Sequence, residues 1–137
     1  MRRPLVLPLV MVALLVAAVA FAAKPQSASA TLTSLAASGV TGSADFKIES
    51  SGNARIHESL SGLTPGAEYT SVVYIGNATC GSGAVAVQIM TFTANNAGRA
   101  NFNTVLPPQA VPALDGGASI SVQQASTLVA CGEIVAQ

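Results

Sequence analysis

The chain has 137 residues, of which 50% are hydrophobic and only 9% are charged. Formal charges balance over the whole chain, but from Thr31 onward three cationic residues stand against six acidic residues, a net charge of −3. The absence of a basic patch argues against nucleic acid as a partner. About 107 residues follow Ala30, which is enough for one domain with a modest core.

The N-terminus has the pattern of an export signal. Arg2 and Arg3 supply positive charge, residues 4–23 are apolar, and Ala28-Ser29-Ala30 offers the small residues that a signal peptidase needs. We therefore expect a signal helix within residues 1–30, cleavage at its end, and a secreted, periplasmic or cell-surface protein. The alternative is an uncleaved anchor, since about 20 apolar residues also span a bilayer. Contact with a membrane is expected only through this segment.

Alternation of apolar and polar residues predicts β-strands after the leader. In Ser43–Glu49 the side chains of Ala44, Phe46 and Ile48 share one face, and charged residues occupy the other. Further strands are expected at 31–35, 54–60, 69–75, 85–93, 100–105, 119–123 and 127–135. Turn residues separate many of them, at 51–53, 63–66, 95–98, 107–108 and 115–117. Eight short strands without a helical stripe indicate a β-sandwich or a Greek-key barrel.

Two cysteines, Cys80 and Cys131, are present. In a small exported domain two cysteines most often form a disulfide. A redox-active or metal-binding pair is the alternative, but the spacing is not Cys-x-x-Cys and no neighbouring cation would activate a thiol. A structural disulfide is therefore the prediction.

Four segments, taken in order, carry a family resemblance. They are Gly42–Phe46, Leu60–Gly66 with its Gly-Leu-Thr-Pro-Gly turn, Thr93–Ala100, and Leu128–Ile134 with its Ala-Cys-Gly string. Together they resemble the copper/zinc superoxide dismutase family. The resemblance implies an all-β, eight-stranded Greek-key barrel over Thr31–Gln137. It also implies a disulfide that ties Cys80, after the copper-binding strand, to Cys131 on the last strand.

The resemblance does not extend to the metal ligands. Ser71 and Val73 occupy the positions of the family's His-x-His copper pair, and Gln123 occupies that of a later copper histidine. Gln88 matches a zinc aspartate, and Leu128 matches the arginine that guides superoxide. Copper and zinc in such sites require several imidazole nitrogens. We therefore expect no metal, no cofactor and no dismutase activity.

The single histidine, His57, offers little chemistry of its own. On its predicted strand it lies on the face opposite to Ile56 and Leu60, so it should face outward as a surface or hydrogen-bonded side chain. The alternatives are a weak metal site with Glu58 or Glu68, and general-base catalysis. Adjacent strand residues point to opposite faces, which disfavours the pairing with Glu58.

Three functional hypotheses remain open. The first is a non-catalytic, exported superoxide dismutase-like domain that acts as a structural or binding module for an unidentified envelope or extracellular partner. The second is a diverged copper/zinc superoxide dismutase with an atypical metal set. The third is a chordin-type (CHRD) domain, which resembles the same turn and flanking strands but carries histidine where Ser71-Val72-Val73 stands here.

Overall fold

The computed structural model describes residues 27–76, 79–81, 85–108 and 117–137. Within them the protein has eight strands: β1 (Ser27–Ser34), β2 (Thr41–Ile48), β3 (Ala54–Ser61), β4 (Glu68–Ile75), β5 (Val85–Thr93), β6 (Ala100–Leu106), β7 (Ala118–Gln124) and β8 (Thr127–Ala136). The all-β prediction is confirmed. No helix in these described ranges is long and apolar enough to cross a membrane.

The first strand begins earlier than predicted. We expected it over 31–35, but β1 starts at Ser27 and pairs with β2 from the register Ser27↔Lys47 onward. Ala28 and Ala30 are buried in the core. Residues 1–26 of the predicted leader lie outside the described residues, whereas its last four residues belong to the sheet.

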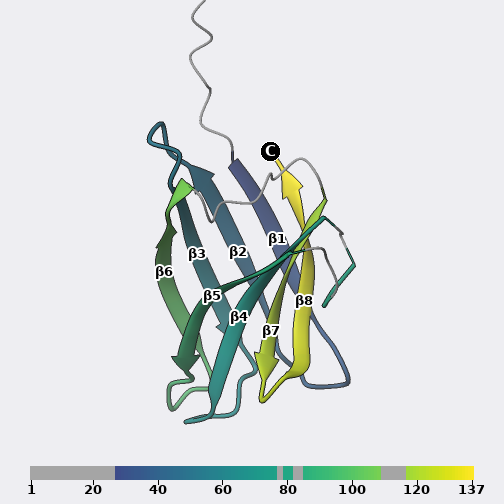
Figure 1. Ribbon diagram of the computed structural model, residues 1–137. Coiled ribbons are helices and arrows are strands. Elements are labelled where there is room, and N and C mark those ends of the chain that lie inside the picture. The colour runs from purple at the N-terminus through teal and green to yellow at the C-terminus, as the bar shows by residue number, and fades with distance from the viewer. Residues whose placement is uncertain (1–26, 77–78, 82–84, 109–116) are drawn as a thin grey trace, which may run out of the picture.

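All strands pair antiparallel in the order β5-β4-β7-β8-β1-β2-β3-β6. The sheet folds over on itself into a first half of β1, β2, β3 and β6 and a second half of β4, β5, β7 and β8, joined where β8 pairs with β1. Figure 1 shows β4, β5 and β7 lying in front of β1, β2 and β3. Strands β4, β5 and β6 follow one another and β7 returns beside β4, which is Greek-key connectivity.

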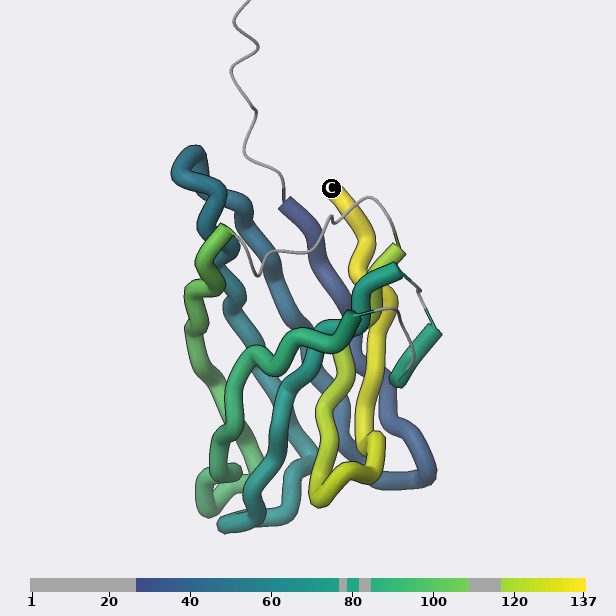
Figure 2. Tube along the Cα trace, viewed as in Figure 1, coloured from purple at the N-terminus to yellow at the C-terminus, as the bar shows by residue number. Residues whose placement is uncertain are grey.

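The barrel is not fully closed: β5 and β6, which stand at the two ends of the hydrogen-bonded order, do not pair with each other. Figure 2 shows β5 running obliquely across the molecule before the chain turns into β6. Aromatic rings fill this side of the interior: Phe92 on β5 stacks on Tyr69 with centroids 5.9 Å apart and meets Phe102 on β6 at 4.8 Å. Side-chain packing therefore joins the two halves where the ladder does not.

The predicted alternation on β2 and β3 is confirmed. Ala44, Phe46 and Ile56 are buried, while Asp45 and Lys47 are exposed. The connection from β3 to β4 is held by Tyr69, whose hydroxyl accepts a hydrogen bond of 2.9 Å from the backbone N–H of Thr64. This contact resembles the tyrosine corner of other Greek-key proteins, and it fixes the turn that carries the chain from one half to the other.

Candidate functional site

The three residues matched to copper ligands do not lie together. Ser71 and Val73 are completely buried on the inward face of β4. Gln123 pairs in register with Thr70, the residue before Ser71, so its side chain lies on the opposite face. There its amide donates a hydrogen bond of 2.7 Å to the hydroxyl of Tyr74. No site can form from all three side chains, because the barrel wall separates them.

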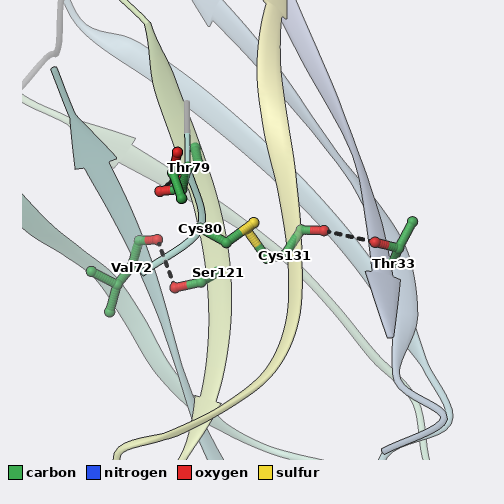
Figure 3. Close-up of a disulfide and its surroundings, with 7 residues drawn as sticks. Thr33, Val72, Thr79, Cys80, Ser121 and Cys131 are labelled. Carbon is green, nitrogen blue, oxygen red and sulfur yellow. Dashed lines mark hydrogen bonds between the residues drawn. A yellow bond between two sulfur atoms is a disulfide. The ribbon is translucent and has the colours of Figure 1, made fainter. Parts of the chain in front are cut away.

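The disulfide prediction is confirmed: Cys80 and Cys131 are bonded, with Cα atoms 5.8 Å apart, an ordinary separation. Figure 3 shows the Cys80 segment lying over β7 and β8. Hydrogen bonds surround the disulfide: Ser119 Oγ donates to Thr79 O (3.3 Å), Ser121 Oγ to Val72 O (3.5 Å) and Thr33 Oγ1 to Cys131 O (3.3 Å). This arrangement covers the outer face of β7, where Ser119 and Ser121 are fully buried. Both cysteines are used in this bond, so the described chain has no free thiol.

Among the described residues, one carboxyl group lies in the interior, and the sequence had not led us to expect it there. Glu58 is 0% exposed, and its only side-chain partner among the described residues is Ser71, whose Oγ lies 3.0 Å from Oε1 and 2.8 Å from Oε2. We had considered Glu58 only as a metal partner for His57. Glu58 is two residues from both Ile56 and Leu60 on β3, so the alternation of the strand predicts that it faces the core with them. Burial raises the pKa of the Glu58 carboxyl from 4.5 to about 7, and the Ser71 hydrogen bond lowers it in part.

His57 lies on the outer face of β3, as predicted. Its Nδ1 is 3.0 Å from Oδ1 of Asn103 on the neighbouring strand β6. The structure does not bring Glu58 to it, because Glu58 points into the barrel, and Glu68 is exposed at the start of β4. Within the described ranges no three His, Cys, Asp or Glu side chains gather as a metal site would require.

A pocket of about 440 Å³ lies beside His57, between the start of β1 and the strands β2 and β3. Its lining includes the outward-facing residues Asp45, Lys47, Arg55 and His57. It also reaches Ala28 and Phe46, which are buried in the core. Arg55 is held by an ion pair with Glu49 at 2.8 Å. Lys47 and Arg55 are two of the three cationic residues found after the leader. This pocket therefore brings charges of both signs and an imidazole together on one surface.

Comparison with known proteins adds no family to these observations. No protein-family model matches the chain. A search of curated proteins also finds no match.

Proposed function

We propose that this protein is an exported, non-catalytic domain of the superoxide dismutase-like type, acting as a structural or binding module in the cell envelope or at the cell surface. The observation that carries the proposal is the placement of Ser71 and Val73 inside the packed barrel, with Gln123 on its outer side. A copper site at these positions would need side chains that converge.

The kinship and the export parts of the proposal have separate support. A Greek-key barrel of eight antiparallel strands, with a disulfide from the segment after β4 to the last strand, agrees with what the resemblance implies. The disulfide also favours an oxidising compartment over the cytoplasm. The predicted leader, most of which lies outside the described residues, points the same way.

The pocket beside His57 is the surface that we assign to binding. It lies on the half of the barrel away from the disulfide, and it offers cations, an acid and an imidazole. Such a mixture suits a polar ligand or the polar surface of a partner protein. The described interior is packed with apolar side chains, apart from the buried Glu58 and Ser71.

Metal analysis of the purified protein, combined with a superoxide turnover assay, tests the non-catalytic part of the proposal. We expect no stoichiometric copper or zinc and no turnover after incubation with both metals. About one equivalent of bound copper with measurable turnover would instead establish the diverged dismutase.

Retention of components from envelope fractions tests the binding part. We expect the wild-type protein to retain a reproducible component, and the variant Lys47→Glu to lose it because the substitution reverses a charge in the pocket. The matched control is Arg99→Glu, which makes the same charge change at an exposed residue outside this pocket. Failure of the wild-type protein to retain anything, or equal losses in both variants, would contradict the assignment.

A further inference from the structure

Glu58 and Ser71 face each other across the inside of the barrel. Glu58 is on β3, in the first half, and Ser71 is on β4, in the second half. Strands β3 and β4 are not neighbours in the sheet order. The contact between these two side chains therefore connects the halves directly through the core, and not along a ladder of backbone hydrogen bonds.

The geometry of the contact suits a neutral carboxylic acid. Both carboxyl oxygens lie within hydrogen-bond distance of the same hydroxyl oxygen, at 3.0 and 2.8 Å. A serine hydroxyl has one proton, and an ionised carboxylate can only accept. In the neutral acid, the Glu58 O–H donates to Ser71 Oγ while Ser71 donates to the other carboxyl oxygen, so both contacts become hydrogen bonds. In the carboxylate, one of the two contacts has no proton.

Nothing charged in the described part of the chain faces Glu58. Its cross-strand neighbours are Ala44 on β2 and Phe102 on β6. The titratable residue on the inward face of β4 is Tyr69, whose hydroxyl is bound to the Thr64 backbone. The other titratable groups on the strands are exposed or lie on the outer face: Asp45, Lys47, Arg55, His57, Glu68, Tyr74 and Glu133. Among the described residues, no cation lies in this core to stabilise the carboxylate.

We propose that Glu58 and Ser71 form a proton-dependent latch between the two halves of the barrel, closed when Glu58 is neutral and weakened when it ionises. On ionisation the Glu58 proton passes to water, Ser71 keeps one hydrogen bond to the carboxylate, and the other hydrogen bond is lost. The buried charge then favours any opening of β3 from β4 that admits water. Burial raises the Glu58 pKa to about 7, which places the transition near neutral pH. This inference does not depend on the proposed function.

The test measures chemical unfolding of the purified protein, with its disulfide intact, at a series of pH values from about 4 to 9. The comparison is between wild type and Glu58→Gln, whose amide donates to Ser71 and accepts from it as the neutral acid does but cannot ionise. We expect the wild-type unfolding constant to rise by roughly 10-fold for each pH unit between the unfolded and the folded pKa. The Glu58→Gln profile should lack this rise. The matched control, Glu133→Gln at an exposed residue of β8, should keep the wild-type profile.

Two outcomes would overturn the latch. One is a wild-type profile as flat as that of Glu58→Gln, and the other is a control that flattens as much as Glu58→Gln does. Hydrogen exchange adds a local readout. In the wild-type protein, the amides of β3 and β4 should exchange faster as the pH rises, by more than the intrinsic exchange rate increases. Equal gain on every strand would mean that Glu58 affects overall stability and does not latch these two strands.

A second measurement covers the case in which Glu58→Gln does not fold. Infrared difference spectra of the wild-type protein should show the carbonyl band of a neutral carboxylic acid at pH 6, where exposed glutamates are ionised. The band should disappear as the pH rises through the folded pKa. A spectrum without that band at pH 6 would show that Glu58 is already ionised, and the proposal would fail.

Discussion

Glu58 illustrates how one residue can give a stable barrel a dependence on pH. Its folded pKa of about 7 lies above the ordinary value of 4.5, so between these values the folded state binds more protons than the unfolded state. Stability is therefore greatest below the ordinary pKa and falls as pH rises through the folded one. A difference of this size corresponds to about 3 kcal/mol of unfolding free energy, a large fraction of a domain's typical stability of 5–15 kcal/mol.

His57 and its chain neighbour Ile56 provide a contrast at the same scale. His57→Ala should lower the free energy of unfolding by less than about 1 kcal/mol, because it removes one surface hydrogen bond, to Asn103. Ile56→Ala, the control, removes a fully buried side chain and should cost about 2–5 kcal/mol. Denaturant unfolding of both variants measures these changes. A loss of several kilocalories per mole in His57→Ala would contradict this prediction, because it would show that the ring is buried and makes stabilising contacts.

At the scale of the element, the turn between β7 and β8 is strained. Ala125 and Ser126 have φ values of 47° and 69° and join strands paired up to Gln124↔Thr127. A two-residue hairpin turn with both φ values positive is normally built from Asn-Gly. Neither glycine nor asparagine stands at this position in the sequence, and the predicted turns did not include it.

Ser126→Gly should therefore stabilise the protein by about 1 kcal/mol, because glycine adopts positive φ without the steric penalty of a side chain. The midpoint of denaturant unfolding measures the change. Ala97→Gly is the matched control: it lies in another exposed turn but is not among the residues with positive φ. There the added backbone freedom of the unfolded chain should leave stability unchanged or lower it. Similar gains in both variants would contradict this explanation.

The first strand shows how pairing, and not local sequence, decides where an element begins. Ser27–Ala30 reads as the end of a leader because its residues are small. In the fold, Ala28 and Ser29 pair with β2 on one side and β8 on the other. Gln137 adds a backbone hydrogen bond of 2.9 Å to Ser27 and a side-chain hydrogen bond of 2.6 Å to Ser29. Small residues suit both a peptidase site and the crowded centre of a sheet.

At the scale of the whole molecule, the disulfide and the latch act on different parts. Cys80 follows β4 and Cys131 lies on β8, so the disulfide fastens the second half to itself across a sequence separation of 51 residues. The latch, the aromatic rings and the β8–β1 ladder join that half to the first. Reduction should therefore weaken the domain without changing how its stability depends on Glu58.

Closing a loop of this length stabilises by about 4 kcal/mol in the chain-entropy account. Treatment with dithiothreitol should consequently lower the melting temperature by more than about 10 °C, with no metal released. The slope of stability against pH should stay as it is in the oxidised protein, because the two features share no side chains. Calorimetry with and without reductant at two pH values measures both effects. An unchanged melting temperature would show that the disulfide contributes little, and an altered slope would show that the two are coupled.

Much of this architecture follows from the sequence alone. Alternation with a period of two places Ala44, Phe46 and Ile56 inside and His57 outside, since successive strand residues point to opposite faces. The strand count follows from this alternation together with turn residues at several connections, and the disulfide follows from two cysteines in a chain with a predicted export signal. Tertiary structure alone decided that Glu58 faces Ser71, that Ser71 and Gln123 lie on opposite sides of the wall, and that β1 reaches back to Ser27. These three features depend on the register between strands that are distant in sequence, and that register cannot be predicted from local sequence patterns.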